Sequence, residues 1–452
     1  MAERVLRVAV VGSGPSGIYA ADALTGQSAV PATVDVFDRL PAPYGLVRYG
    51  VAPDHFSIRS VRGTLEKVLE RPTVRFLGNV EIGRDLSLGD LQRRYDAVIL
   101  TYGAARDRRL GIPGEDLPGS VAATDLVAWY CGHPEAPRAE MEDAVSSATA
   151  AVVVGVGNVA VDVVRVLAKA PEELADTDMP QHVLDLLASD SITDIHLLGR
   201  RGPAQGAFTT KELRELGELA DADVLLDPAD LDLDELSQAA VDGSKVLARN
   251  VEVLRDWGSR QPEGKRRRIH VRFFTRPVEL KGTDRVAEVV VERTELDAEG
   301  RAQGTGELSS IPAQLVVRSV GYRGMPLEGV PFDAARNVIP SSDGRVLDGD
   351  AVVPGLYVAG WIKRGPTGII GTNKKDAAQT VTSLLEDAEA GRLPEPTEAG
   401  DVVPLLEDRG IDVVTFDRWK AIDAAEVALG GTNGRARTTL HDRAEMLACV
   451  PD

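Results

Sequence analysis

The chain has 452 residues, of which 43% are hydrophobic and 27% are charged, and this composition excludes a disordered protein. The formal net charge of −19 argues against broad binding to nucleic acid or to anionic membranes, which requires a basic surface. With two cysteines and no apolar stretch near the roughly 18 residues of a membrane helix, neither a disulfide framework nor a membrane span is predicted. The N-terminal residues contain no basic segment followed by an apolar one, so we expect a cytoplasmic protein. The length predicts two or three domains.

The first elements in chain order form a strand–helix–strand pattern. Leu6–Gly12 is predicted to be a buried strand, and Pro15–Leu24 is predicted to be the helix that follows it. Val34–Asp38 and Asp96–Thr101 are predicted as further strands. Strands that alternate with helices are typical of a parallel α/β sheet.

A second unit of the same kind begins after the turn-rich segment 111–119 (GIPGEDLPG). Its first strand is predicted at Ala150–Val154, its helix at Asn158–Ala168 and its next strand at Asp194–Leu198. The fold class is therefore α/β with two sheets.

Other segments depart from this alternation. Residues 171–191 and 218–243 are acidic and are predicted to be helical insertions, whereas residues 269–296 are predicted to be antiparallel strands with a turn at Lys281–Asp284. Gln314–Ser319 is predicted as a closing strand. We place one domain at residues 105–321, inserted within another that is formed by residues 1–104 and 322–452.

The first strand leads into a glycine fingerprint, Gly12-Ser13-Gly14-Pro15-Ser16-Gly17. In a dinucleotide-binding (Rossmann) unit, the first glycine makes a tight turn, the second lets a pyrophosphate approach the backbone and the third lets the helix pack on the strand. Asp38 ends the next strand, where an acid meets a ribose hydroxyl. The alternative is a tight turn without a ligand. The pattern favours FAD or NAD, held by Gly12, Gly14 and Gly17.

The second fingerprint is Gly155-Val156-Gly157-Asn158-Val159-Ala160, with alanine in the third place. Its second strand is followed by Arg200 and Arg201 instead of an acid. Two guanidinium groups at this place match the 2′-phosphate of NADP, although an exposed arginine pair in a loop is the alternative.

Two dinucleotides on one chain imply that a hydride passes from one to the other. Cys131 and Cys449 lie far apart in the sequence and form no C-x-x-C motif, so a dithiol relay is excluded. No cysteine set that could bind an iron–sulfur cluster is present, and we predict no metal site. The electrons must therefore leave the flavin for an external acceptor.

Five long motifs, in order along the chain, resemble those of the adrenodoxin-reductase-type ferredoxin–NADP⁺ reductases. They are PYGLVRYGVAPDH (43–55), IPGEDLPGS (112–120), GRRGPAQGAFTTKELREL (199–216), QLVVRSVGYRG (314–324) and GWIKRGPTGIIGTNKKDA (360–377). The resemblance covers about residues 5–385 and more loosely the rest. The lack of a targeting segment suits a bacterial member.

The resemblance implies non-covalent FAD in the outer domain and NADPH/NADP⁺ in the inserted one. Matched positions imply these FAD contacts: Ser16, Asp38, Leu46, Ile82, Trp361, Gly368, Ile369 and Ile370. They imply these NADP contacts: Arg108, Asn158, Val159, Ala160, Val161, Arg200, Arg201, Glu212 and Gly368. His55 and Glu215 are implied as a polar pair near the flavin, with a structural hydrogen bond as the alternative role of His55. Asp38 departs slightly from relatives that carry Glu.

A helix is predicted at Lys374–Leu385, after the small, Gly-rich segment Thr367–Asn373. The N-terminus of such a helix would stabilise the negative charge of a reduced flavin. Four basic clusters are candidates for docking an acidic partner: Arg106–Arg109, Lys265–Arg268, Lys363-Arg364 and Lys374-Lys375. For Lys265–Arg268 a solvated loop is the alternative.

The favoured function is that of an NADPH–ferredoxin oxidoreductase: NADPH reduces FAD, and FAD passes single electrons to an acidic iron–sulfur ferredoxin. Two alternatives stay open. A flavin-dependent NADPH monooxygenase shares both fingerprints but needs a pocket for an organic substrate, for which no motif is present. A non-catalytic flavin and NADP redox sensor would bind both cofactors and be reduced slowly or not at all.

Overall fold

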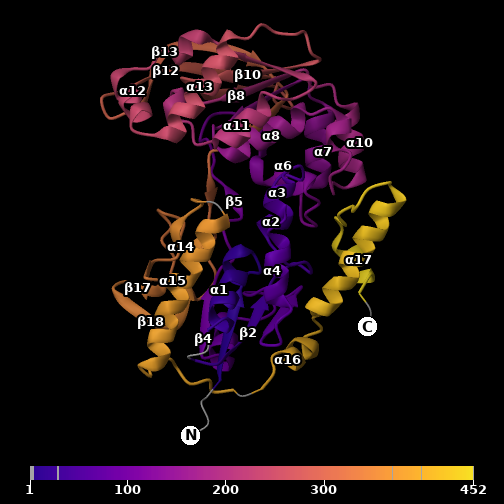
Figure 1. Cartoon of the computed structure of the whole chain (residues 1–452), viewed down its shortest axis with the longest axis vertical. Helices are drawn as coiled ribbons and strands as arrows, with labels where there is room; N and C mark the ends of the chain where they lie inside the picture. Colours follow the sequence, from indigo (N-terminus) through magenta and orange to yellow (C-terminus); the bar gives the residue numbers. More distant parts are fainter. Residues whose placement is uncertain (1–4, 28–29, 369, 399, 451–452) are drawn as a thin grey trace. The chain divides into compact units, whose positions relative to one another are not determined.

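The structure, a computed structural model, describes residues 5–27, 30–368, 370–398 and 400–450. The chain forms two compact units (Figure 1). Unit 1 comprises Met1–Arg106 and Tyr322–Asp452, and unit 2 comprises Asp107–Gly321. Unit 2 is therefore inserted in the chain of unit 1, with its first boundary two residues beyond the sequence-based one. The short strands β5 (Arg106–Asp107) and β15 (Tyr322–Arg323) pair where the chain leaves and re-enters unit 1.

Unit 1 contains an eight-stranded sheet in the order β16-β17-β18-β4-β1-β2-β3-β19. Its five central strands are parallel, and the three outer ones are antiparallel to their neighbours. The bounds are β1 (Leu6–Val11), β2 (Ala32–Phe37), β3 (Val74–Gly78), β4 (Ala97–Leu100), β16 (Ser341–Ser342), β17 (Arg345–Asp348), β18 (Ala351–Val358) and β19 (Val414–Thr415).

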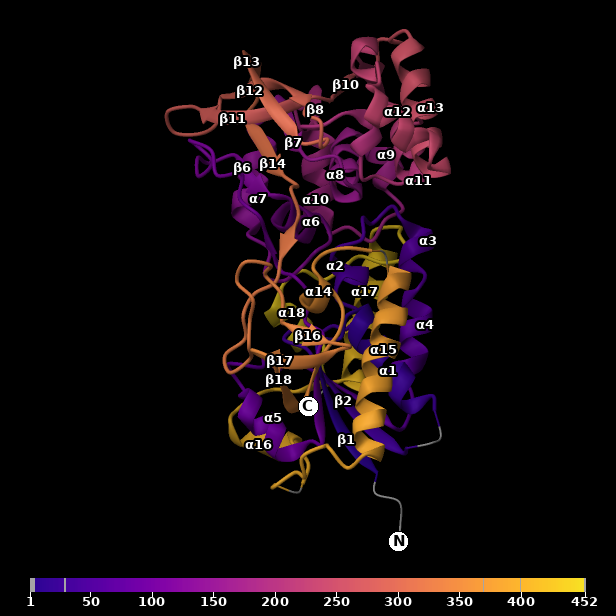
Figure 2. The same cartoon turned by 90° about the vertical axis from the view of Figure 1, so that its left-hand side faces the viewer.

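Helices cover this sheet because alternate residues of its strands are apolar on both faces. Val8 and Val10 of β1 join the core that also contains the helices α1 and α15, which lie side by side (Figure 2), whereas Ala9 and Val11 join the opposite core. The helices of unit 1 are α1 (Pro15–Thr25), α2 (Leu46–Tyr49), α3 (Phe56–Arg59), α4 (Arg62–Leu69), α5 (Leu88–Arg94), α14 (Trp361–Arg364), α15 (Ile370–Glu389), α16 (Val403–Asp408), α17 (Phe416–Thr432) and α18 (Arg443–Ala448).

Unit 2 contains a six-stranded parallel sheet in the order β6-β14-β7-β8-β10-β9 and a three-stranded antiparallel sheet in the order β11-β12-β13. The two sheets share a core that includes Val152, Val154, Leu198 and Val289. The bounds are β6 (Ser120–Ala122), β7 (Ala150–Val154), β8 (Asp194–Leu198), β9 (Ala222–Leu226), β10 (Arg267–Arg272), β11 (Thr275–Lys281), β12 (Glu288–Leu296), β13 (Ala302–Pro312) and β14 (Leu315–Arg318).

The helices of unit 2 include two in the acidic insertion at 171–191, as predicted. Their bounds are α6 (Ala123–Tyr130), α7 (Arg138–Ser146), α8 (Asn158–Ala168), α9 (Pro171–Leu174), α10 (Gln181–Ser189), α11 (Thr210–Leu216), α12 (Glu235–Asp242) and α13 (Lys245–Ser259), with 3₁₀ turns η1 (Pro203–Gln205) and η2 (Pro228–Leu231). Among the described residues, no helix is both long and apolar enough to cross a membrane.

Three sequence-based predictions about elements are wrong in part. Residues 218–243 are not entirely helical, since they contain β9, the edge strand of the parallel sheet. Residues 269–296 are not a simple antiparallel set, because β10 belongs to the parallel sheet and only β11 and β12 pair antiparallel. The helix predicted at Lys374 begins at Ile370, because the small residues before Lys374 continue its first turn.

Candidate dinucleotide-binding sites

The glycines of the turn between β1 and α1 are of two kinds: those that the packing of the chain requires and one that it does not. Gly12 has φ +109°, and a Cβ there would lie 2.9 Å from the backbone of Thr101. A Cβ on Gly17 would lie 1.9 Å from the Gly12 carbonyl oxygen, so the close packing of α1 on β1 requires glycine at both positions. A Cβ on Gly14 meets only the Gly45 Cα, at 3.9 Å. The fold therefore does not require glycine at position 14, since a Cβ there would make only an ordinary van der Waals contact with Gly45.

The N-terminus of α1 supplies the donors for such an anion. Pro15 is the first helical residue, and the amides of Ser16 and Gly17 belong to the first turn, which has no partners within the helix. Ser16 is buried, and a Cβ on Gly360 would lie 2.3 Å from its Oγ. The turn thus lies directly against the segment that precedes Trp361.

Asp38 is fixed at the end of β2. Its Oδ2 accepts from the Ser13 amide at 2.9 Å and from the Ser13 hydroxyl at 2.5 Å, and its Oδ1 accepts from the Leu40 amide at 3.0 Å. A carboxylate has about four acceptor sites, so one remains for a ribose hydroxyl. Of the other predicted contacts, Ile82 is buried in the core whereas Leu46 is 43% exposed.

The segment at α14 is held by a carboxylate that the sequence reasoning missed. Asp376 of α15 accepts from the Gly360 amide at 2.5 Å and from the Lys363 ammonium group at 2.9 Å. Trp361 stacks on Tyr322 with ring centroids 5.4 Å apart, and its buried Nε1 has no hydrogen-bond partner among the described residues. That N–H is therefore an unsatisfied buried donor. The i to i+13 spacing of Lys363 and Asp376 is not a helical spacing, so no local pattern marks this ion pair.

Two further predicted flavin contacts lie at the start of α15. Gly368 is exposed and has φ +86°, and Ile370 is the first residue of the helix. Ile369 lies outside the described residues.

In the turn between β7 and α8, too, packing requires the first glycine of the fingerprint but not the second. Gly155 has φ +127°, and a Cβ there would lie 2.1 Å from the Ser319 carbonyl oxygen. Nothing lies within 4 Å of a Cβ on Gly157, so that position leaves room for a phosphate. In the third place Ala160 is fully buried. Asn158, the first residue of α8, accepts from the Thr209 amide at 2.7 Å and so ties the turn to α11.

Three arginines of unit 2 are available to an anion. Arg200 and Arg201 follow β8 and are exposed, and their backbone is fixed because their carbonyl oxygens accept from Thr294 Oγ1 at 2.8 Å and from the Phe274 amide at 3.2 Å. Arg108 is exposed as well. Among the residues that the structure describes, none forms an ion pair with these guanidinium groups. Of the other predicted contacts in this unit, Val159 is half-buried and Val161 is buried.

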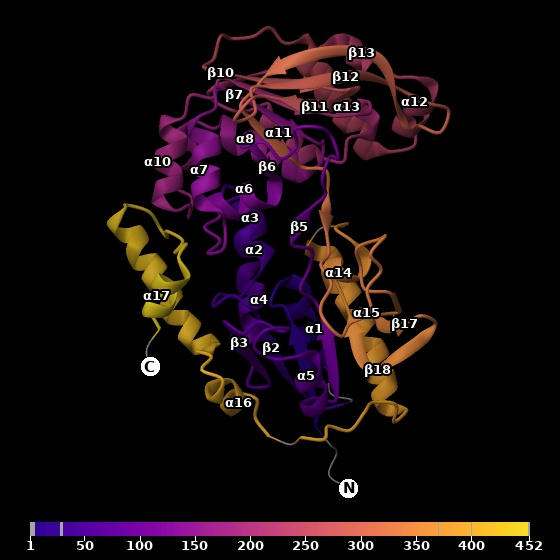
Figure 3. The same cartoon turned by 180° about the vertical axis from the view of Figure 1, so that it is seen from behind.

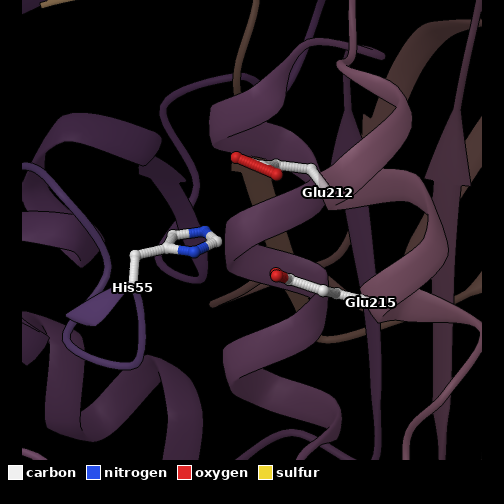
Figure 4. A group of neighbouring side chains, drawn as sticks. All are labelled: His55, Glu212 and Glu215. Carbon is white, nitrogen blue, oxygen red and sulfur yellow. The ribbon is translucent and has the colours of Figure 1, made fainter. Parts of the chain in front are cut away.

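Helix α11 carries two predicted site residues, Glu212 and Glu215, about one turn apart (Figure 4). Glu212 is buried in the first turn, where the helix dipole favours a negative charge. Glu215 lies 3.7 Å from Arg165 of α8 and 3.6 Å from Lys211, so it also has a structural role within unit 2. His55 belongs to unit 1, where it is buried at the N-cap position of α3.

The basic cluster Lys265–Arg268 does not form a free docking patch. Arg267 is buried and its guanidinium group pairs with Asp190 at 3.0 Å, while Arg268 pairs with Asp194. Lys265 donates to the Leu219 carbonyl oxygen at 2.9 Å. The solvated-loop alternative holds only for Lys265 and Arg266, because Arg267 and Arg268 begin β10. Successive side chains of a strand point to opposite faces, so Arg267 is directed inward and Arg268 outward. A cluster of basic residues in the sequence does not by itself reveal this difference.

The fold and the two turns define a protein with two dinucleotide-binding units, one inserted in the other. No family model matches the chain. The NADPH-ferredoxin reductase FprA of Mycobacterium tuberculosis is 47% identical over 97% of this chain and 98% of its own length. Human mitochondrial NADPH:adrenodoxin oxidoreductase is 41% identical over 98% of this chain and 92% of its own.

A solved structure is also similar to this chain. Mycobacterium tuberculosis FprA in complex with NADPH superimposes with a TM-score of 0.92 at 45% identity, covering 99% of each chain. The protein is therefore an oxidoreductase enzyme that belongs to the adrenodoxin-reductase-type ferredoxin–NADP⁺ reductases, as the five motifs predicted.

Proposed function

We propose that the protein is an NADPH–ferredoxin oxidoreductase that holds FAD non-covalently in unit 1 and NADPH in unit 2. One observation carries this assignment: each unit has a glycine turn whose second glycine is not required by the packing of the chain, and the two turns differ in the side chains that come after the next strand. In unit 1 an anchored carboxylate, Asp38, can accept from a ribose hydroxyl. In unit 2 the exposed Arg200 and Arg201 suit a 2′-phosphate.

When bound, FAD supplies the chemistry of accepting a hydride and returning single electrons. The role of the chain itself is to bind and orient the two cofactors. The amides at the start of α1 and α8 would hold the two pyrophosphates, and Asp376 fixes the Gly360–Trp361 segment beside the first of these turns. Hydride transfer depends on this geometry and needs no nucleophile.

His55 and Glu215 remain our candidates for a polar pair near the flavin. Their support is the position that each occupies in a family motif, since the structure gives Glu215 an additional role beside Arg165. Gly12, Gly17, Gly155 and Ala160 shape the turns, whereas Gly14 and Gly157 are proposed to face the phosphates.

We propose that the iron–sulfur partner is an acidic ferredoxin that docks at Lys374 and Lys375. Both side chains are exposed on the first turns of α15. Lys363 is a weaker candidate because Asp376 neutralises it, and Arg109 is paired with Asp116 at 2.5 Å. The bacterial relatives favour a cytoplasmic location.

The decisive experiment mixes the purified protein anaerobically with NADPH and candidate ferredoxins, and follows flavin absorbance and ferredoxin reduction. We expect rapid flavin bleaching and then ferredoxin reduction. Oxygenation of an organic substrate at the expense of NADPH would instead indicate a monooxygenase. A flavin that NADPH bleaches slowly or not at all would indicate a redox sensor.

A further inference from the structure

The segment Tyr44–Leu46 of unit 1 has a strained backbone and lies against the first glycine turn. Tyr44 has φ +84°, a conformation that is rare for a bulky residue, and Gly45 has φ +49°. The Tyr44 amide donates to the Ser13 carbonyl oxygen at 3.0 Å. A Cβ on Gly45 would lie 2.8 Å from the Gly14 Cα. The segment therefore lies directly against the turn at which the pyrophosphate is proposed to bind, and neighbouring side chains must hold it in this strained conformation.

Helix α17, near the C-terminal end of the chain (Figure 3), supplies that support. Its residues Trp419, Asp423 and Glu426 follow the i, i+4, i+7 spacing of one helix face. Trp419 is buried and meets the ring of Tyr44 edge-on, with centroids 6.2 Å apart and planes at 78°. This contact reaches the strained residue itself.

Glu426 forms the second contact, with Arg48 of α2, the helix that begins at Leu46, the last residue of the strained segment. The side chains are 0% and 5% exposed, and Arg48 Nη1 donates to Glu426 Oε2 at 3.1 Å while Nη2 donates to Oε1. The Glu426 carboxylate accepts two further hydrogen bonds, from Arg437 Nη1 at 2.8 Å and from the Leu440 amide at 2.9 Å. A buried ion pair between residues 378 apart, in which both Glu426 oxygens accept hydrogen bonds, fixes α2 to α17.

Arg62 of α4 forms the third contact. Its guanidinium carbon lies 5.4 Å from the ring centroid of Tyr44 and 5.9 Å from that of Trp419, and its Nη2 pairs with Asp423. The two aromatic rings therefore lie beneath one cation that α17 itself anchors.

We propose that α17 is a positioning element for the FAD site: Glu426 acting through Arg48, and Trp419 acting on Tyr44, hold Tyr44–Leu46 against the glycine turn. The inference rests on the proposed binding of FAD in unit 1. Without this support the segment relaxes from its strained backbone and moves away from Gly14. Retention of FAD then depends on residues at the opposite end of the chain.

The test compares Glu426→Gln with Lys420→Gln in the full-length protein. Gln keeps the shape of Glu426 but removes the charge that Arg48 needs, whereas Lys420 lies on the same helix in an exposed pair with Glu70 at 3.5 Å. The measurements are the FAD dissociation rate from flavin fluorescence, the visible circular dichroism of bound flavin, and urea unfolding of the apoprotein. We expect Glu426→Gln to release FAD about tenfold faster or more and to change the flavin dichroism, with no change in Lys420→Gln. Excess FAD should restore bleaching by NADPH in Glu426→Gln.

Release of FAD from Glu426→Gln at the parental rate, with unchanged dichroism, would overturn the proposal. So would a loss of affinity that only follows a matching loss of apoprotein stability. If Glu426→Gln does not fold, Asp423→Asn decides, because Asp423 is 26% exposed and acts through Arg62. Parental release from that variant also overturns the proposal. A parent protein that binds no FAD would refute the proposed function itself, which is a separate outcome.

Discussion

Gly14 and Gly17 lie three residues apart, yet different constraints apply to them. A Cβ on Gly17 collides with the Gly12 carbonyl oxygen at 1.9 Å, whereas a Cβ on Gly14 stays 3.9 Å from its nearest neighbour. We expect Gly14→Ala to fold with an apoprotein stability within about 1 kcal/mol of the parent and to lose FAD affinity about tenfold or more. Gly17→Ala should destabilise the apoprotein itself. FAD titration and urea unfolding separate the two effects; normal FAD affinity of Gly14→Ala would contradict the placement of the pyrophosphate.

The arginines after β8 should determine the preference for NADPH. Each charge-assisted hydrogen bond to a phosphate contributes about 1.5–3 kcal/mol, so replacing Arg200 or Arg201 by alanine should weaken NADPH binding about 10–100-fold. Binding of NADH, which lacks that phosphate, should change little. Arg301→Ala, an exposed arginine of the same unit, is the control. The two dissociation constants measure the effect, and equal losses for NADPH and NADH would refute the assignment.

His196 should make unit 2 sensitive to acid. Burial, together with the charges of His270 and Arg272, lowers the pKa of His196 from 6.5 to about 3. The Arg272 Nε donates to its Nδ1 at 3.2 Å, and the His270 ring stacks on it at 4.4 Å. Between pH 6.5 and 3 the unfolded state binds a proton that the folded state does not bind, so stability is present above pH 6.5 and is lost as the pH falls.

For a single group this loss has a slope of at most about 1.4 kcal/mol per pH unit. Urea unfolding at pH 7.5, 6 and 5 should show it, and His196→Asn, which keeps an acceptor for Arg272, should reduce the slope. A residual slope is expected because burial also lowers the pKa of His270. An unchanged slope in His196→Asn would exclude His196 as its source.

At the scale of elements, the central Rossmann parts of unit 2 were predictable to the residue, whereas those of unit 1 differ from the prediction by one or two residues. Ala150–Val154, Asn158–Ala168 and Asp194–Leu198 were predicted from the sequence with the bounds that β7, α8 and β8 have. Their apolar runs are continuous, and the fingerprint fixes where the helix begins. By contrast β9 and β10 were missed as parallel strands because β10 begins with two arginines and β9 lies within an acidic stretch.

Candidate site residues can be named from the sequence where they lie in the fingerprints, and not where distant residues hold the site in place. Gly14, Gly157 and Arg200 follow directly from local patterns; a Cβ at either glycine would meet no close neighbour, and Arg200 is exposed. Asp376 and Glu426 were missed because each acts on a partner that only the tertiary structure brings near. No periodicity relates Arg48 to a carboxylate 378 residues away.

At the scale of the whole molecule, the net charge of −19 sets a condition on an acidic partner. Long-range repulsion must be overcome by a local basic patch, so docking should depend on a few lysines and on ionic strength. The Debye length falls from about 10 Å at 0.1 M salt to about 3 Å at 1 M, and we expect ferredoxin reduction to slow accordingly while an uncharged dye is reduced as before.

Charge reversal should identify that patch. Lys374→Glu with Lys375→Glu should raise the ferredoxin KM and spare reduction of the dye. Lys245→Glu with Arg301→Glu, which changes the net charge equally at exposed positions of unit 2, is the control. Steady-state kinetics over a salt series measures both effects. Ferredoxin turnover that is independent of salt and of the Lys374 and Lys375 reversals would rule out this docking surface.

The ends of unit 2 meet: the Arg108 amide donates to the Gly321 carbonyl oxygen at 2.9 Å. A domain whose two ends are one hydrogen bond apart can be removed from its host chain and the gap closed by a short linker, with little entropy lost in closing the loop. We therefore expect that residues 107–321 could be replaced by the corresponding segment of a relative, and that the coenzyme preference would change with the segment.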